Sequence, residues 1–284
     1  MQTANRTSAD IISHLELEGY CIIDEVIPSN EVAGVRDNVF AAFEAQSAAA
    51  AAHAHKVRGQ GHRLGGAGVQ AVTGLLNLDQ SVAPYLADDR IISAVEGLFG
   101  PYCRITNVSA MVNNAGNDRG YWHSDWPYNQ TNASHIPAPY ADQPIKLSSI
   151  WMLTDFSPHT GGTLVIPGSQ KMRTNPSGGD CHDREAPHAA EMQISGAPGS
   201  VMLFDSRLWH SVTTNNSDGP RIALNVGYAP WWLNVQPTIE GTADFERMVV
   251  EPQGKPNINP PLDRAVFETL PAAVKPLFRH SVSL

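Results

Sequence analysis

The sequence has few cysteines, no long apolar run and no pattern of a leader peptide. Its three cysteines, Cys21, Cys103 and Cys181, are widely spaced and odd in number, which favours neither a disulfide framework nor a cysteine-ligated zinc site. No run approaches the roughly 18 apolar residues that a membrane span needs. Residues 1–10 lack the basic-then-apolar order of a secretory signal. These absences predict a cytoplasmic protein with free thiols.

Basic residues are also scarce. Lys and Arg number 19 against 28 Asp and Glu, giving a formal net charge of -9. Binding to phosphate backbones or anionic lipid requires a basic surface, so we expect no nucleic-acid partner and no membrane partner.

The chain has 284 residues, of which 42% are hydrophobic, enough to bury one substantial core. We expect a single domain over residues 1–284 with a helical N-terminal part to about 100. An all-β core follows from about 101 to 230, and then an irregular, proline-rich tail with one or two weak helices.

Helical spacing of apolar residues predicts three helices before the core. The first is capped by Ser8 and stopped by Gly19, ahead of a short strand over residues 20–23. The second follows Pro28 and runs into the alanine tract 48–52, and the third covers 88–99. Between the last two, Gly, His and Arg residues over 53–68 indicate a loop.

The core consists of short runs rich in β-branched and aromatic residues, separated by Gly, Pro, Asn and Asp. Their spacing suits a jelly roll better than a parallel sheet. The predicted strands are Thr106–Asn113, Leu147–Thr154, Thr163–Pro167, Gly199–Asp205, Trp209–Thr214 and Arg221–Tyr228.

His123 and Asp125 stand two residues apart, so in extended backbone both side chains point to one face and can reach one metal ion. Such a pair alone is also found as a histidine beside a turn aspartate. A second element, 87 residues after His123, supplies a further histidine, His210.

His210 lies in a strand–turn–strand pattern that continues to Arg221. If Thr214 faces Arg221 across a hairpin, His210 and Arg221 share a face with an offset of roughly 13 Å. A five-carbon dicarboxylate bound to the metal at one end could reach the fork of Arg221 at the other. Taken alone, Arg221 could equally be a solvated charge at a strand end.

Two imidazoles and one carboxylate leave three positions of an octahedron open, the arrangement of non-haem Fe(II) oxygenases. Two rival functions remain at this point. One is a jelly-roll metal enzyme that hydrolyses or isomerises its substrate without oxygen, and the other is a non-catalytic ligand-binding module.

Four motifs, in order and spacing, resemble those of the phytanoyl-CoA dioxygenase family, which includes ectoine hydroxylases. They are the Glu18-Gly19-Tyr20 opening, Tyr121-Trp122-His123-Ser124-Asp125, Gly161-Gly162-Thr163-Leu164-Val165-Ile166-Pro167-Gly168-Ser169-Gln170, and His210 with Arg221.

The resemblance implies a mainly β fold, a cupin-like double-stranded β-helix (jelly roll) with flanking, mostly N-terminal helices. It implies an Fe(II)- and 2-oxoglutarate-dependent dioxygenase that uses O2, hydroxylates a small organic molecule and releases succinate and CO2. Iron ligands fall on His123, Asp125 and His210. Co-substrate contacts fall on Arg221, Trp151, Asn113 and Met111.

Trp126 and Tyr128, which follow the metal motif in a loop, are candidates for the substrate pocket. Trp122 and Trp209 have the opposite parity to the ligands and are expected in the core.

Two positions depart from the family pattern, and a third bears on the type of reaction. Gln170 stands where the family has a histidine, and Val212 where some members have a serine that bonds the co-substrate. Asp125 is retained, whereas related halogenases carry a small residue there, so the sequence favours hydroxylation over halogenation. The substrate itself depends on loops whose shape one sequence does not define.

Overall fold

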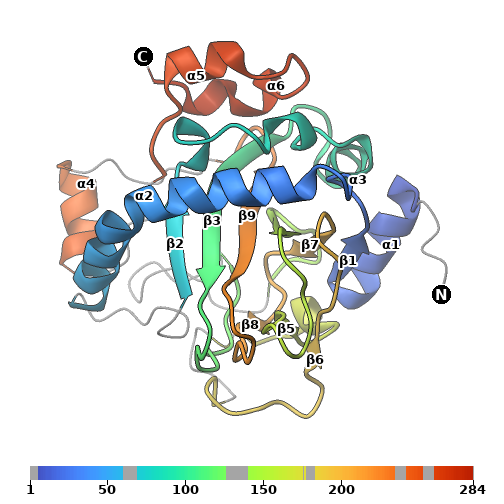
Figure 1. The fold of residues 1–284 in the computed structure, drawn as a ribbon. Coiled ribbons are helices and arrows are strands. Elements are labelled where there is room, and N and C mark those ends of the chain that lie inside the picture. Colours follow the sequence, from blue (N-terminus) through green and yellow to red (C-terminus); the bar gives the residue numbers. More distant parts are fainter. Residues whose placement is uncertain are drawn as a thin grey trace.

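The computed structural model describes residues 6–59, 69–125, 140–174, 176, 183–233, 241–251 and 259–283, with the backbone alone at 47–59 and 248–249. Two antiparallel sheets form its centre, and helices cover the outer face of the larger sheet (Figure 1). This is a double-stranded β-helix with flanking helices, as the sequence predicted.

The larger sheet has six strands in the order β1-β7-β4-β9-β3-β2. The smaller sheet has the order β6-β5-β8. The strand bounds are β1 Tyr20–Ile23, β2 Val69–Thr73, β3 Arg104–Asn113, β4 Leu147–Met152, β5 Leu164–Val165, β6 Met192–Gln193, β7 Val201–Asp205, β8 His210–Ser211 and β9 Arg221–Ala229.

Side chains alternate between the two faces of the larger sheet and so divide into two cores. On β9, Leu224 and Val226 belong to the main core, which the helices cover. Ala223 belongs to a second cluster with Met152, Phe156 and Phe204, together with Val165 of the smaller sheet. This second cluster marks the inner face of the barrel, between the sheets.

The N-terminal helices are α1 (Ser8–Glu18), α2 (Val32–Gly59) and α3 (Asp89–Phe99). Thr7, one residue before the predicted cap, caps α1 by a reciprocal bond with Asp10. Gly19 ends α1 in the left-handed conformation at φ 86°. Buried apolar residues of α2 pack into the main core as its helix crosses the sheet (Figure 1).

Two predictions need correction, and two strands were not predicted at all. Residues 53–59 are the end of α2, not a loop, because the alanine tract extends the helix to Gly59; residues 60–68 lie outside the described chain. β8 pairs with β5 and β9 pairs with β3 and β4, so the predicted hairpin between them is not formed. The sequence also gave no signal for the short strands β2 and β6.

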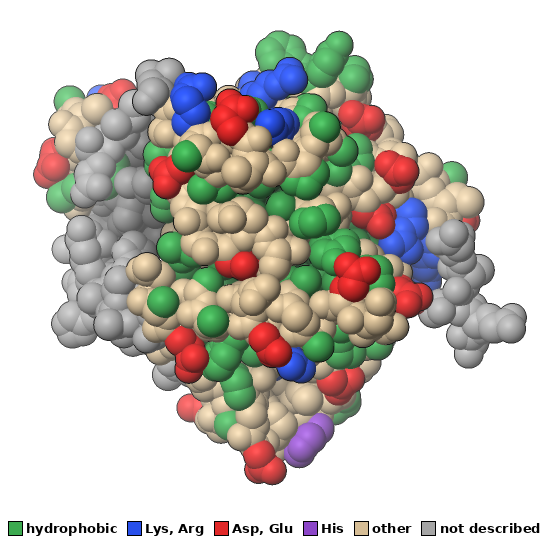
Figure 2. Space-filling model, turned by 45° about the horizontal axis from the view of Figure 1, so that its top comes forward, with side chains coloured by type: hydrophobic (Ala, Val, Ile, Leu, Met, Phe, Trp, Pro, Cys, Tyr) green, Lys and Arg blue, Asp and Glu red, His purple; other side chains and the backbone are tan. Residues whose placement is uncertain are grey.

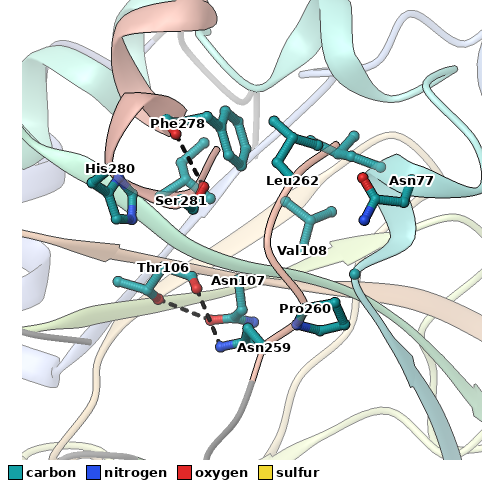
Figure 3. Close-up of a pocket in the computed structure, with 13 residues that line it drawn as sticks. Asn77, Thr106, Asn107, Val108, Asn259, Pro260, Leu262, Phe278, His280 and Ser281 are labelled. Atoms are coloured by element: carbon teal, nitrogen blue, oxygen red, sulfur yellow. Dashed lines mark hydrogen bonds between the residues drawn. The ribbon is translucent and has the colours of Figure 1, made fainter. Parts of the chain in front are cut away.

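The tail is more ordered than predicted. It contains α4 (Ala243–Phe245), a π-helical turn at Glu246–Val250, α5 (Arg264–Thr269) and α6 (Lys275–Phe278). Its Leu262, Val274 and Phe278 are buried in the main core. A pocket lies between this tail and the sheet, lined by Asn107, Asn259 and His280 among others (Figure 3). None of the predicted metal ligands lines that pocket.

Acidic side chains are scattered over the face shown in Figure 2, whereas Lys and Arg occur there in small groups. No described helix is both long and apolar enough to cross a membrane.

Candidate active site

The three predicted metal ligands lie together. His123, Asp125 and His210 each offer a ligand atom within 4.8 Å of the other two, the one such group of His, Cys, Asp and Glu found in the described part of the chain. The His123 and His210 rings are 4.2 Å apart between centroids, and Asp125 Oδ1 is 3.5 Å from His210 Nε2.

Backbone pairing produces this arrangement. His123 and His210 exchange two N–H to O bonds of 3.1 and 3.0 Å, which adds the His123 segment to the smaller sheet beside β8. The Asp125 N–H donates to Ser206 O at 2.8 Å. Two residues that alternate along one extended segment therefore face a histidine on its neighbour.

Hydrogen bonds also determine which imidazole nitrogen can bind a metal. His123 Nδ1 lies 3.1 Å from Tyr121 O, and His210 Nδ1 lies 2.9 Å from Leu208 O. A carbonyl oxygen only accepts, so each Nδ1 carries the proton and each Nε2 keeps its lone pair for a cation. The donor set, two neutral imidazoles and one carboxylate, fits Fe(II).

The charges of the site favour an ionised carboxylate. Burial raises the pKa of Asp125, but His210, Lys146 and His123 together outweigh burial and bring that pKa well below its usual range. For His210, burial lowers the pKa and the neighbouring Asp125 raises it, with a net rise. The Asp125 carboxylate therefore carries a negative charge that a bound metal cation can neutralise.

Arg221 is a buried cation with no anionic partner in the described part of the chain. It is 7% exposed, and its guanidinium lies 4.3 Å from the ring centroid of Phe156. No described residue forms an ion pair or hydrogen bond with this guanidinium, and Nε is buried with no partner. Burial lowers the pKa of Arg221 to about 10, so it still carries its charge at neutral pH.

Arg221 shares the inner face of the barrel with two of the predicted co-substrate residues. In the register of β3 with β9, Asn113 is opposite Arg221 and Met111 is opposite Ala223. Direct cross-strand partners point to the same face, and Ala223 belongs to the inner cluster. The inner face therefore includes Asn113 and Met111.

Trp151 does not reach this face. It is opposite Leu224 on β9, is fully buried in the main core, and donates from Nε1 to Ser149 Oγ at 2.9 Å. A register one residue away would have placed it inside. We therefore do not retain Trp151 as a co-substrate contact.

Of the aromatic residues near the metal motif, Trp126 and Tyr128 lie outside the described residues. Trp122 and Trp209 form a small core with Leu164 and Ile166, as their parity predicted. Trp122 Nε1 donates to Ala186 O at 3.0 Å.

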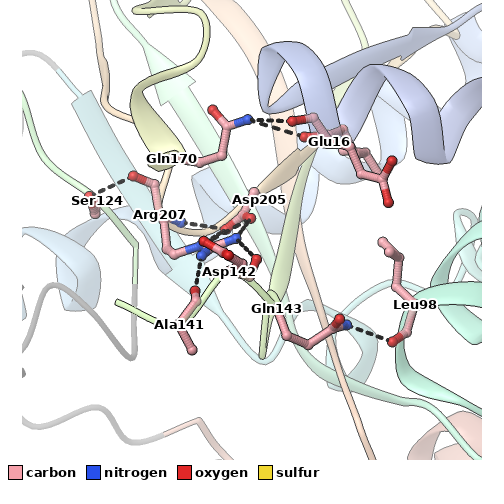
Figure 4. A network of polar contacts seen from close by, with 10 residues as sticks. Glu16, Leu98, Ser124, Ala141, Asp142, Gln143, Gln170, Asp205 and Arg207 are labelled. Carbon is pink, nitrogen blue, oxygen red and sulfur yellow. Dashed lines mark hydrogen bonds and ion pairs between the residues drawn. The ribbon is translucent and has the colours of Figure 1, made fainter. Parts of the chain in front are cut away.

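The turn at residues 205–208 holds the metal motif through hydrogen bonds to its backbone oxygens (Figure 4). Sequence reasoning missed this role. Asp205 and Arg207 form a buried ion pair of 2.6 Å, and Arg207 also donates to the backbone oxygens of Ala141 and Asp142. Arg207 O accepts from Ser124 Oγ at 3.0 Å, next to the Asp125–Ser206 bond. No motif in the sequence marks this turn.

Sequence reasoning also missed Lys146, the residue before β4. It is 5% exposed, and Nζ donates to Ser148 Oγ at 3.1 Å. Its charge acts on both Asp125 and His210.

A double-stranded β-helix with two histidines and one aspartate in a metal-binding group is the arrangement found in non-haem iron oxygenases. A model of the phytanoyl-CoA dioxygenase family matches residues 15–223, and the chain belongs to that family. It is thus a 2-oxoglutarate-dependent dioxygenase by family, with its metal-binding triad intact and with Fe(II) and 2-oxoglutarate as cofactors.

One curated protein is similar in sequence, and two solved structures share the fold. An ectoine dioxygenase of Nocardia farcinica is 28% identical over 175 residues, 54% of this chain and 56% of the relative. HygX from Streptomyces hygroscopicus, solved with nickel, 2-oxoglutarate and hygromycin B, has a TM-score of 0.58 at 16% identity, covering 83% of this chain and 92% of HygX. EctD from S. alaskensis, solved with bound Fe, has a TM-score of 0.57 at 18% identity, covering 81% and 79%.

Proposed function

We propose that this protein hydroxylates a small organic molecule, with conversion of 2-oxoglutarate and O2 to succinate and CO2. His123, Asp125 and His210 hold Fe(II), and Arg221 anchors the far carboxylate of 2-oxoglutarate. Asn113 and Met111 line the co-substrate site beside Arg221.

The observation that carries this proposal is Arg221. A guanidinium that is removed from water without an anionic partner costs free energy, so its burial on the inner face points to an anionic ligand. Its planar fork suits a carboxylate in a bidentate arrangement. A hydrolase or isomerase using the triad alone has no need of this residue.

Each residue then has a defined task. His123 and His210 bind the iron through Nε2, because the carbonyls of Tyr121 and Leu208 hold the protons on Nδ1. Asp125 stays ionised and neutralises one charge of the cation. When bound, iron and 2-oxoglutarate would supply the electrons that activate O2. The apolar cluster around Phe156 and Phe204 excludes water from this side of the site.

The family and the relatives support a small-molecule substrate, since the relatives' names refer to ectoine and hygromycin B. Retention of Asp125 supports hydroxylation over halogenation. Cys21 and Cys103 are buried free thiols, which supports a reducing, cytoplasmic location.

An anaerobic titration tests the proposal without knowledge of the substrate. Metal-free protein receives Fe(II) and then 2-oxoglutarate, and the visible charge-transfer band of the chelate is recorded. We expect the band in wild type and a 2-oxoglutarate Kd at least tenfold weaker in Arg221→Met, because one charge-assisted carboxylate contact is lost.

The exposed Arg264 provides the control, and Arg264→Met should behave as wild type. Iron binding without a chelate band would contradict the proposal and favour a hydrolase or isomerase. A normal band without succinate release in air, across a broad set of substrates, would favour a binding module.

A further inference from the structure

We propose that Lys146 binds a carboxylate of the substrate, so that the hydroxylated compound is a small carboxylic acid. This inference rests on the proposed function, and it assigns the substrate class of the same site. It follows from the burial of Lys146, its packing over Gly227, its position along the barrel and the charge of the loaded site.

Lys146 is a buried ammonium whose hydrogen-bonding capacity is largely unused. It has three N–H donors, and its one partner among the described residues is Ser148 Oγ at 3.1 Å. That hydroxyl lies 3.1 Å from Ser206 Oγ, so the neighbours of the ammonium are neutral. No described carboxylate lies within 4.0 Å of Nζ. At least one donor has no partner in the described part of the chain and is available to a ligand.

Gly227 leaves room on the inner face for Thr106, Asn107 and Lys146 together. A Cβ at Gly227 would lie 3.1 Å from Lys146 Cε, and closer still to Thr106 Oγ1 and Asn107 Oδ1, at 2.3 and 2.5 Å. Gly227 is opposite both Asn107 on β3 and Ser148 on β4. The stem of Lys146 therefore crosses the sheet at a point without a side chain, on the same inner face as Ser148 and Asn107.

Lys146 and Arg221 occupy opposite ends of that face. Gly227 and Arg221 are six residues apart on β9, which corresponds to roughly 20 Å of strand. The triad is closer to the Lys146 end, since the His210 ring lies 5.0 Å from Phe204, and Phe204 is opposite Ser148. Arg221 is assigned to 2-oxoglutarate, so Lys146 lies on the side of the metal that is left for the substrate.

The charge of the loaded site favours an anion at this position. Burial lowers the pKa of Lys146, and the charge of Asp125 only partly opposes that effect, so an anion beside Nζ favours the charged form. When Fe(II) binds, Asp125 becomes its ligand, and the iron with Asp125 leaves one positive charge. Charged Lys146 adds one more and Arg221 another, and the two negative charges of 2-oxoglutarate offset two of the three. One positive charge remains in the interior, and a monocarboxylate neutralises it.

The experiment measures how acids and their neutral amides perturb the chelate band. Wild type with saturating Fe(II) and 2-oxoglutarate is titrated anaerobically with matched pairs, N-acetyl amino acids and the corresponding N-acetyl amino acid amides with aliphatic, aromatic and polar side chains. Displacement of 2-oxoglutarate appears as loss of the band, whereas a substrate-like ligand shifts it.

We expect several acids to shift the band at concentrations at least tenfold below those of their amides. Lys146→Met should abolish that preference, and Lys146→Arg, which keeps the charge, should retain it. Met has a similar shape and removes a buried charge, so the fold should tolerate it; Lys146→Gln serves the same purpose if Met does not fold.

Amides as effective as acids, a panel in which no acid shifts the band, or an acid preference that persists in Lys146→Met would overturn the inference. Failure of the proposed function is distinguishable, because the wild type would then form no chelate band at all. A normal band without acid preference would contradict the role of Lys146 alone.

Discussion

Asp125 combines a position near the metal with a weak role in packing. Its side chain is 20% exposed, and its neighbours in the site are the two histidines and Lys146. A carboxylate in such a position contributes to ligand binding more than to the core.

We therefore predict that Asp125→Ala abolishes oxidation while the protein stays folded. Loss of the one anionic ligand should lower Fe(II) affinity at least tenfold, measured by titration, and succinate release should fall below detection. Asp218→Ala removes an exposed aspartate in a turn and is the matched control. Normal turnover in Asp125→Ala would disprove the triad.

The residues found from the sequence share a property that spacing can encode. His123 and Asp125 alternate along one extended segment, and His210 and Arg221 are the first residues of β8 and β9, so parity and order are enough to find them. Trp151 was assigned wrongly because its face depends on the register of β4 against β9, which depends on long-range pairing. Lys146 carried no signal at all, since a lysine before a strand is usually a solvated charge.

Gln170 connects two elements that are distant in the sequence. Nε2 donates to Leu15 O at 3.3 Å and Glu16 O at 3.2 Å, at the C-terminal end of α1 (Figure 4). Gln170 is 3% exposed, and the adjacent Gly168 N–H donates to Glu18 O. Gln170, which stands where the family has a histidine, thus links α1 to the turn after β5 by hydrogen bonds.

We predict that Gln170→Ala lowers the free energy of unfolding by about 1–3 kcal/mol, because two helix-end carbonyls lose a buried donor. Urea unfolding measures the change. The neighbouring Lys171 is exposed, so Lys171→Ala should change stability by less than about 0.5 kcal/mol. Equal effects of the two variants would contradict this role.

The turn of Asp205 and Arg207 gives a second prediction for an element. Arg207→Met leaves the Asp205 carboxylate buried without its cation, which should cost about 3–5 kcal/mol. Iron affinity should fall as well, because the turn's carbonyls hold Ser124 and Asp125. Urea unfolding and Fe(II) titration measure the two effects.

The chain contains its own control for this turn. Asp88 and Arg90 have the same spacing and the same ion pair, but are more exposed, at 16% and 26% of their side chains. Arg90→Met should therefore cost less and leave iron affinity unchanged. In the double variant Asp205→Leu, Arg207→Met, stability should partly recover, since no unpaired charge remains. If the turn does not position the metal ligands, the iron affinity of Arg207→Met should equal that of wild type.

At the scale of the whole molecule, the sequence predicted the class of architecture but not that β8 and β9 belong to different sheets. Both strands were identified, and the turn between them suggested a hairpin. In the jelly roll they belong to different sheets and approach across the interior. Local turn residues cannot distinguish these two outcomes, because the choice depends on which strands compete for each edge. The sequence likewise did not predict burial of the tail, because the helices of the tail are short.

The packing of the tail on the sheet makes stability depend on pH. Burial, and then Arg104, lower the pKa of His280 to about 4. An unfolded histidine titrates near 6.5, so between pH 6.5 and 4 the unfolded state binds more protons than the native state. The contribution of His280 to the free energy of unfolding is therefore complete above about pH 7 and is lost as the pH falls through that window.

We predict that wild type loses roughly 1–2 kcal/mol more than His280→Leu between pH 7 and pH 5, from urea unfolding at each pH. Both ring nitrogens of His280 are buried without a partner, so the apolar replacement should not destabilise the fold at pH 7. Parallel pH profiles of the two proteins would exclude His280 as the source.

Gly227 has a consequence for how this protein can evolve. A side chain at 227 would first meet Thr106 Oγ1 and Asn107 Oδ1, at 2.3 and 2.5 Å, and would also press on Lys146 Cε, at 3.1 Å. Related enzymes that acquire alanine or a larger residue at 227 should therefore carry smaller residues at 106 and 107. Where the lysine also changes to a shorter, neutral residue, the enzyme should accept neutral compounds.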